Sequence, residues 1–179
     1  MNQILFRILL YLLCFEILSV RLVAQINTQI PINDSSFHSE VHWVDFEHFD
    51  SLYLNKENSK TQVFNFWATW CKPCVMELPY FLALEEKWKD APIEFYYVSL
   101  DFPNKLEKTL LPFMIKNKMS SKVIVLDQKD VNSWIHFIHA NWSGALPATL
   151  IKTREETLFY EDSFHSVDEL EKFISKHLK

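Results

Sequence analysis

The feature that most limits the folds open to this chain is the segment Cys71-Lys72-Pro73-Cys74, which lies between two hydrophobic patterns. Residues 63–67, just before it, form a short apolar run with β-branched and aromatic side chains, which predicts a buried strand. Residues 71–89 carry apolar side chains at helical spacing. The expected inward face of this helix comprises Cys74, Leu78, Phe81 and Trp88. A strand that runs directly into a helix, with a cysteine at the junction, predicts an α/β sheet protein.

The rest of the chain continues the alternation of strands and helices. Further strands are predicted at residues 93–100, 123–126, 148–152 and 157–160, and the last two form a hairpin. Further helices are predicted at residues 45–54, 103–118, 131–142 and 166–177. Pro79 and Pro112 are expected to bend the helices that contain them. Ser166, with Glu169 three residues later, is typical of a capping box at the start of the last helix.

Composition excludes two classes of function. The chain contains a single glycine, Gly144, whereas Gly-rich phosphate loops and dinucleotide-binding turns need several. Its formal net charge is -5 and it has no run of basic residues, so it lacks the electrostatic features of a nucleic-acid-binding protein. Hydrophobic residues make up 49% of the chain, which is enough to build a core. We therefore expect a globular protein without a nucleic-acid partner.

Residues 1–24 are interpreted as a signal peptide or a membrane anchor. Arg7 precedes an apolar run at residues 8–20, and Ala24 offers a small side chain for cleavage. The run is short against the roughly 20 residues of a spanning helix, which favours a cleaved signal, although Glu16 interrupts it. Residues 25–40 are polar and predict a linker or arm, and residues 41–179 are assigned to the folded domain. Both interpretations of the N-terminus predict an exported protein, in the periplasm or on the outer face of the membrane.

The cysteine pair is better explained by chemistry than by stability. A bridge between Cys71 and Cys74 closes a very small loop and constrains the unfolded chain little. The start of a helix offers free backbone N–H groups and the positive end of the helix dipole, which favour a thiolate at Cys71, and Lys72 adds a positive charge. Cys74, one turn further on, is close enough to form a disulfide with Cys71 and is expected to face inward. The pattern predicts an exposed nucleophile and a sheltered resolving thiol.

Two other interpretations of the pair remain open. A zinc site would need two further ligands, for which His136 and His139 are the candidates, although they fit an ordinary helix face better. A purely structural disulfide is the second, although so small a loop stabilises a fold little. Exchange chemistry at two cysteines needs neither a metal ion nor an organic cofactor, and we expect none.

Three motifs carry a resemblance to a known family. The first is the string Phe-Trp-Ala-Thr-Trp-Cys-Lys-Pro-Cys, which ends at Cys74. The second is Glu77-Leu78-Pro79, and the third is the loop at residues 142–149 that contains Pro147. Together they resemble the thioredoxin superfamily over residues 41–179, and in particular the TlpA/ResA-like exported thiol-disulfide oxidoreductases. In that family Pro79 would be the helix-kinking proline, and Pro147 would be cis and would pack against the cysteine pair.

The resemblance implies a thioredoxin fold, with a central mixed sheet flanked by helices. The stretch between the second and third motifs is longer than in plain thioredoxin, which implies an extra strand-helix insertion between the Cys-x-x-Cys helix and the cis-proline loop. Glu77 matches a glutamate near the active site of ResA-like proteins and is expected to handle the proton of Cys74. Asn65 stands where plain thioredoxin has an acidic residue. The residues expected to bind the substrate are Trp70, Pro73, Leu146 and Pro147.

The function implied by the resemblance is thiol-disulfide exchange, which reduces protein disulfides outside the cytoplasm. The implied partners are proteins with disulfides or dithiols, with apocytochrome c as one candidate, and a membrane electron donor that restores the dithiol. Two other classes of function remain open. A thiol peroxidase is one, because peroxiredoxins share the fold. A non-catalytic binding module is the other, because folds are reused for unrelated functions.

Overall fold

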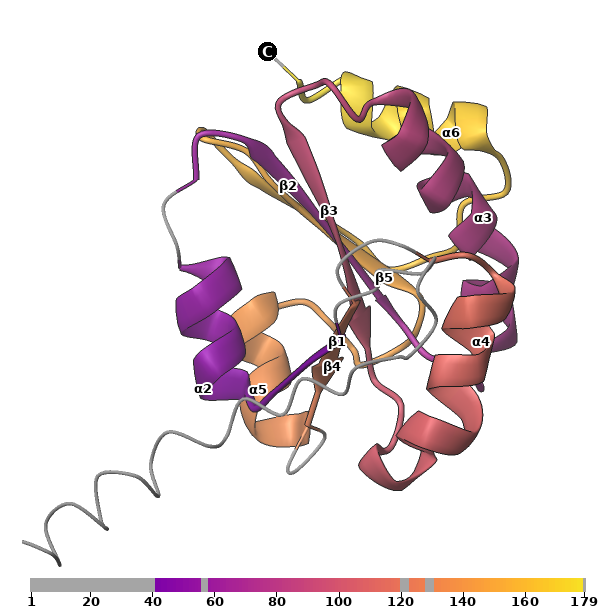
Figure 1. Cartoon of the computed structure of the whole chain (residues 1–179). Helices are drawn as coiled ribbons and strands as arrows, with labels where there is room; N and C mark the ends of the chain where they lie inside the picture. Colours follow the sequence, from indigo (N-terminus) through magenta and orange to yellow (C-terminus); the bar gives the residue numbers. More distant parts are fainter. Residues whose placement is uncertain (1–40, 56–57, 120–122, 128–130, 179) are drawn as a thin grey trace, which may run out of the picture. The chain divides into compact units, whose positions relative to one another are not determined.

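The computed structural model describes residues 41–55, 58–119, 123–127 and 131–178, and their backbone forms a six-stranded sheet with helices on both faces (Figure 1). The predictions for residues 1–24 and 25–40 concern parts of the chain that lie outside the described residues. None of the described helices is long and apolar enough to cross a membrane.

The strands and helices alternate along the chain before a final hairpin and helix. The strands are β1 (Val41–Val44), β2 (Thr61–Trp67), β3 (Ile93–Ser99), β4 (Val123–Leu126), β5 (Ala148–Lys152) and β6 (Thr157–Tyr160). The α-helices are α2 (Phe46–Phe49), α3 (Lys72–Lys87), α4 (Leu111–Lys116), α5 (Val131–Ile138) and α6 (Val167–Ser175). Single turns of other helical types precede or follow them, at η1 (Asp50–Leu54), η2 (Pro103–Lys105) and η3 (Leu106–Leu110).

The sheet is mixed, with the strand order β1-β4-β3-β2-β5-β6. The first four strands in this order are parallel, whereas β5 pairs antiparallel with both β2 and β6. The unit β4–α5 lies between the Cys-x-x-Cys helix α3 and the cis-proline loop, and β4 is inserted in the sheet between β1 and β3. The predicted α/β architecture, with an extra strand-helix insertion, is therefore confirmed.

The helices divide between the two faces of the sheet, with α2 and α5 on one face and α3, α4 and α6 on the other (Figure 1). The central strand β2 shows why, because its side chains alternate in direction. On one face, Phe64 and Phe66 contact the ring of Phe49, the last residue of α2. On the other face, Asn65 forms a hydrogen bond with a residue of α3, and Trp67 contacts the ring of Phe113 in α4. Strand β2 is buried on both faces, as is usual in the centre of a parallel sheet.

Several predicted elements differ from the structure. Strand β1 was not predicted, because its four residues have a mixed exposure pattern and only pairing with β4 makes them a strand. Trp88 is wrong as a member of the inward helix face, since α3 ends at Lys87 and Trp88 follows as its C-cap. The predicted helix at residues 103–118 is three short pieces, and Pro112 lies in the first turn of the last piece. The predicted helix at 131–142 ends earlier, at Ile138.

Candidate active site around the cysteine pair

Cys71 lies at the junction of β2 and α3. The turn from Ala68 to Cys71 is closed by a hydrogen bond in which the Cys71 N–H donates to the Ala68 carbonyl over 3.1 Å. Cys71 then acts as the N-cap of α3, because its sulfur accepts a hydrogen bond of 3.3 Å from the backbone N–H of Cys74. Pro73 occupies the first helical turn, where its missing N–H costs no hydrogen bond. The sulfur of Cys71 thus receives the free N–H groups that a helix N-terminus offers.

Cys71 and Cys74 form a disulfide, with their Cα atoms 5.3 Å apart. Cys74 is fully buried, whereas Cys71 keeps an exposed fraction of 6%. The prediction that the first cysteine is openly exposed is therefore too strong for this oxidised state, because its sulfur is bonded to that of a buried residue. Cys71 nevertheless remains the more exposed residue of the pair.

Glu77 is a buried carboxylate on the inward face of α3, three residues after Cys74. Its oxygens accept one hydrogen bond from the side-chain amide of Asn65 over 2.9 Å and another from the backbone N–H of Phe164 over 2.8 Å. Burial raises the pKa of Glu77 to about 7, against its ordinary value of 4.5, although the two hydrogen bonds oppose this shift. Glu77 is therefore a buried carboxylate that is poised to exchange a proton, in contrast to a glutamate on a solvated helix surface.

Asn65 and Thr149 bring two unpartnered oxygen atoms to the same face of the sheet. The two residues are paired across β2 and β5, so their side chains point the same way. Both are buried, and neither Asn65 Oδ1 nor Thr149 Oγ1 has a hydrogen-bond partner among the described residues. Asn65 therefore connects to Glu77 through its N–H group only, and its carbonyl remains available as an acceptor.

The loop before β5 lies beside the cysteine turn. Ala148, the first residue of β5, is opposite Phe66 near the end of β2, so the preceding residues reach the same edge of the sheet as Cys71. The bond between Leu146 and Pro147 is cis, as the resemblance implies. Gly144 has a φ of 95°, in the left-handed region that favours glycine. The Trp142 indole N–H and the Ala145 carbonyl form a hydrogen bond of 2.9 Å within this loop.

Three large apolar side chains near the cysteine pair are more than half exposed. Trp70 immediately precedes Cys71, Met76 lies on the outer face of α3, and Phe102 follows the end of β3; their exposed fractions are 58%, 63% and 53%. Sequence reasoning singled out Trp70 but missed Met76 and Phe102. Phe102 could have been found from the sequence, because it follows a predicted buried strand, and parallel strands would bring the end of that strand close to Cys71.

Asp101 is a second buried carboxylate at this edge of the sheet, and it was also missed. Its oxygens accept hydrogen bonds from the Thr69 N–H over 3.0 Å, the Thr69 hydroxyl over 2.5 Å and the Ser99 hydroxyl over 2.9 Å. Thr69 belongs to the turn that ends at Cys71. Asp101 therefore links the end of β3 to the turn that carries the cysteine.

The zinc alternative finds no support in the part of the chain that the structure describes. Within it, no three His, Cys, Asp or Glu side chains are grouped so that they could hold a metal ion. His136 is exposed on α5, and the ring of His139 stacks on that of Phe159 with centroids 4.5 Å apart. Neither histidine is placed as a ligand for the cysteine pair.

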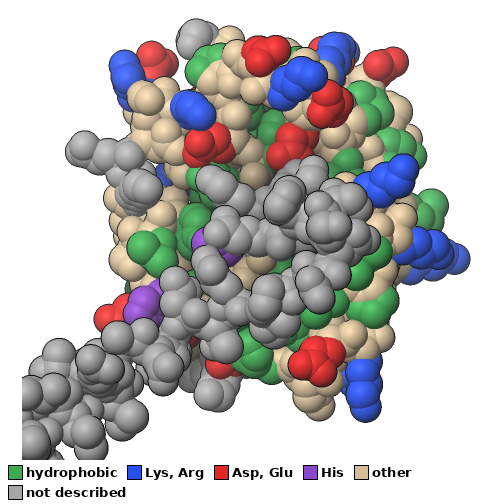
Figure 2. Space-filling model, in the orientation of Figure 1, with side chains coloured by type: hydrophobic (Ala, Val, Ile, Leu, Met, Phe, Trp, Pro, Cys, Tyr) green, Lys and Arg blue, Asp and Glu red, His purple; other side chains and the backbone are tan. Residues whose placement is uncertain are grey.

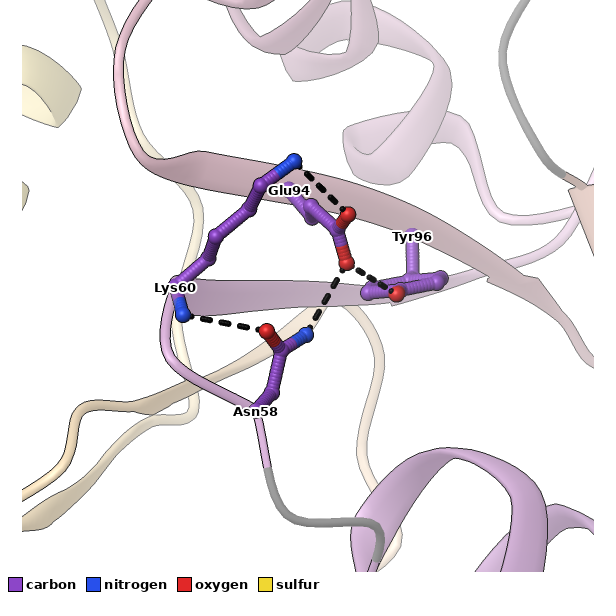
Figure 3. Close-up of polar contacts among 4 residues, drawn as sticks. All are labelled: Asn58, Lys60, Glu94 and Tyr96. Atoms are coloured by element: carbon purple, nitrogen blue, oxygen red, sulfur yellow. Dashed lines mark hydrogen bonds and ion pairs between the residues drawn. The ribbon is translucent and has the colours of Figure 1, made fainter.

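A contrasting carboxylate lies at the opposite edge of the sheet, where β2 and β3 begin. Figure 3 shows Glu94 surrounded by Asn58, Lys60 and Tyr96. Its oxygens accept from the Tyr96 hydroxyl over 2.6 Å, the Asn58 amide over 3.0 Å and the Lys60 ammonium over 3.1 Å. These donors, led by the Tyr96 hydroxyl, lower the pKa of Glu94 to about 2. Glu94 of β3 and Glu77 of α3, which is bonded to Asn65 of β2, thus have pKa shifts in opposite directions.

Comparison with known proteins gives partial matches to one group. A model of the AhpC/TSA family matches residues 43–160. The chain is 41% identical over 51 residues to the thiol-disulfide oxidoreductase ResA of Oceanobacillus iheyensis, which covers 28% of this chain and 27% of that protein. It is 31% identical over 99 residues to ResA of Geobacillus kaustophilus, which covers 55% of this chain and 51% of that protein. The chain thus spans about half, or less, of the length of the curated relatives it matches.

Solved structures resemble the fold more widely. A thiol:disulfide interchange protein of the thioredoxin family from Chlorobium tepidum aligns with a TM-score of 0.56 and 16% identity, over 68% of this chain and 82% of its own. The thioredoxin domain of a thiol-disulfide oxidoreductase from Bacteroides vulgatus aligns with a TM-score of 0.51 and 23% identity, over 68% of this chain and 81% of its own. These similarities confirm the predicted thioredoxin fold.

Proposed function

Because the chain belongs to the AhpC/TSA family, we propose that it is a thiol-disulfide oxidoreductase that reduces protein disulfides through Cys71 and Cys74. One observation carries the proposal. A disulfide at the N-terminus of α3 joins Cys71, which keeps an exposed fraction of 6%, to the fully buried Cys74. An accessible thiolate with a buried resolving thiol one helical turn away is the arrangement that dithiol-disulfide exchange requires.

The exchange proceeds in two balanced steps. The Cys71 thiolate attacks one sulfur of the substrate disulfide, so that a mixed disulfide forms and the other substrate sulfur leaves as a thiolate. Cys74 then loses its proton and attacks the sulfur of Cys71, which breaks the bond to the substrate. Two electrons pass to the substrate, and the protein is left with the Cys71–Cys74 disulfide. A membrane electron donor would then restore the dithiol.

Glu77 is the group that we assign to the proton of Cys74. The two residues are three positions apart on α3, so they share one helix face. Since the pKa of Glu77 is about 7, the carboxyl group exchanges its proton readily near neutral pH. Asn65 holds one carboxyl oxygen through its amide N–H and adds no charge of its own.

Trp70, Pro73, Leu146 and Pro147 are proposed to hold the substrate. Trp70 and Pro73 are exposed on either side of the cysteine that reacts. Leu146 is half-buried beside the cysteine turn, and its backbone is proposed to pair with an extended substrate segment as an added strand. The substrate class is therefore a protein or peptide with an accessible disulfide, for which apocytochrome c is one candidate.

Export is part of the proposal. Residues 1–24 have the character of a signal peptide or anchor, and a redox-active disulfide persists in an oxidising compartment. One similar solved structure is described as a secreted disulfide oxidoreductase from Mycobacterium tuberculosis. The working site we propose is the periplasm or the outer face of the membrane.

Reduction of insulin tests the proposed activity. The purified protein is mixed with insulin and dithiothreitol, and the precipitation of the freed B chain is followed. The native protein should accelerate precipitation, whereas Cys71→Ser should leave only the rate of dithiothreitol alone. Cys74→Ser should accumulate mixed disulfides that appear on non-reducing gels and disappear on reduction. Equal rates for the native protein and Cys71→Ser would exclude this mechanism.

The same preparations separate the two alternative functions. A thiol peroxidase would consume hydrogen peroxide at a rate that depends on Cys71 and would leave insulin intact. A non-catalytic binding module would keep its biological function in a Cys71→Ser, Cys74→Ser double variant. We expect little peroxide consumption and a loss of function in the double variant.

A further inference from the structure

Exposed apolar side chains concentrate on both sides of the reactive cysteine. Trp70 and Phe102 are each more than half exposed, whereas the described residues of the strands before them are almost wholly buried at this end. Charged side chains of both signs are interspersed over the described part of the face in Figure 2. Large aromatic rings left in water next to a reactive group mark a site where a partner covers them.

Strand pairing places Phe102 next to the cysteine turn. Strands β2 and β3 are parallel, with Trp67 opposite Ser99 at their carboxyl ends. Backbone bonding continues past this pair, because the Leu100 N–H donates to the Trp67 carbonyl over 2.8 Å. Two residues beyond the Trp67–Ser99 pair on both segments, the Thr69 N–H donates to the Asp101 carboxylate. Trp70 and Phe102 are the next residues of these two segments. The carboxyl ends of parallel strands are where α/β proteins bind their ligands.

The Asp101–Thr69 contact holds these two segments together. Asp101 has an exposed fraction of only 1%, and its carboxylate accepts hydrogen bonds from both the backbone N–H and the hydroxyl of Thr69. A buried carboxylate is costly unless its oxygens are bonded, and here three donors satisfy them. The position of Phe102 relative to the turn that ends at Cys71 is therefore set by a buried network and not by a free loop.

We propose that Phe102 is a specificity-determining residue for the proposed disulfide exchange, and that it favours substrate cysteines flanked by bulky apolar side chains. The proposal rests on the function proposed above. The occupant of the surface follows from that chemistry, because the mixed disulfide joins the substrate sulfur to Cys71. Since an extended chain spans about 3.3 Å per residue, the residues within two or three positions of the substrate cysteine must cover the surface around Cys71.

Two peptides with an intramolecular disulfide provide the test. They are identical except that the residues flanking one cysteine are leucine in the first and serine in the second. The reduced protein is mixed with each peptide, and the second-order rate constant for oxidation of the protein is measured. The native protein should react about tenfold faster with the leucine peptide, the scale expected for one well-placed aromatic contact. In Phe102→Ala this ratio should fall close to one.

Matched variants separate recognition from folding. Phe102→Leu keeps an apolar side chain and should keep most of the preference even if Phe102→Ala folds poorly. Phe137→Ala removes a phenylalanine that is even more exposed, at 74%, and lies on α5, and it should keep the native ratio. A native ratio in a folded Phe102→Ala protein would overturn the proposal.

Two further outcomes are distinguishable. If the native protein is oxidised by neither peptide, the proposed function itself fails. If it reacts with both at equal rates, the function stands and the specificity proposal fails. Sedimentation of the native protein and of Phe102→Ala examines the other possible occupant of the surface. A dimer that dissociates in the variant would assign the surface to a second copy of the chain and overturn the proposal, whereas a monomer in both supports it.

Discussion

Glu77, on the inward face of α3, and Glu94, near the start of β3, show how position changes one kind of side chain. Glu94 accepts hydrogen bonds from a hydroxyl, an amide and a lysine ammonium, and its pKa is lowered to about 2. Glu77 has two neutral donors and full burial, and its pKa is raised to about 7. The first carboxylate is stabilised in its charged form, whereas the second is destabilised in that form.

The two carboxylates affect stability in opposite directions when they ionise. Ionisation of Glu94 stabilises the fold and contributes to stability at neutral pH. Ionisation of the buried Glu77 destabilises the fold. Such a cost is typical of functional sites, because it brings a proton-exchanging group near working pH. Substitutions of the two residues should therefore have opposite pH dependence.

The largest effect is expected for Glu77→Gln. Since the pKa of Glu77 is about 7 in the folded state, against its ordinary value of 4.5, the folded state binds the proton more tightly, and stability falls as pH rises between these values. Between pH 4 and pH 8 the native protein should therefore lose about 3 kcal/mol of stability that the variant keeps. Urea unfolding of the oxidised proteins measures this. If the stability difference between the native protein and Glu77→Gln is the same at both pH values, the raised pKa of Glu77 is wrong.

Glu94→Gln should have the opposite pH dependence. The folded-state pKa of about 2 lies below the ordinary value of 4.5, so the stabilisation is present above pH 4.5 and is lost as pH falls toward 2. Because the cluster is partly open to solvent, we expect a loss of only about 1 kcal/mol at pH 7. Urea unfolding at pH 7 and pH 3 measures it. Glu86→Gln, which removes an exposed pair with Lys89, is the matched control and should change little.

Tyr96→Phe removes the hydrogen-bond donor that lowers the pKa of Glu94 the most. The pKa of Glu94 should rise toward its ordinary value, and stability at neutral pH should fall by about 0.5 kcal/mol. Titration of the Glu94 carboxyl carbon by NMR gives the pKa directly. An unchanged titration would show that Lys60 and Asn58, and not Tyr96, lower the pKa of Glu94.

Lys60→Met should have the smallest effect, because the Lys60 ammonium is half-exposed and its pair with Glu94 is screened by salt. We expect a loss of about 0.3 kcal/mol in low salt and no loss in 1 M salt. Thermal unfolding in the two buffers measures the difference. A loss that persists in high salt would show that the lysine acts by packing instead of by charge.

The redox centre was the most predictable part of the molecule. The chemistry of Cys71 and Cys74 depends on local order, a strand followed by a helix, and local order is what apolar spacing reveals. The capping box at Ser166 was predicted for the same reason, and the Ser166 hydroxyl accepts from the Glu169 N–H over 3.1 Å. The Glu169 carboxylate accepts instead from the N–H of His165, one residue before the cap.

The partners that shape the site were not predictable, because they come from distant parts of the chain. Glu77 is held by Phe164, 87 positions away, and Asp101 holds Thr69, 32 positions away. No local pattern records such contacts. Strand β1 was missed for the same reason, since its pairing with Val123 and the following residues decides its structure.

The hydrogen bond from the Phe164 backbone to Glu77 ties the cysteine site to the C-terminal helix. Phe164 is buried, and its ring contacts Phe81 of α3 and Phe173 of α6. Shortening or loosening the chain end would admit water to the glutamate and lower its proton affinity. In the proton role proposed for Glu77, the C-terminal part of the chain would therefore adjust the proton affinity of the group that serves Cys74.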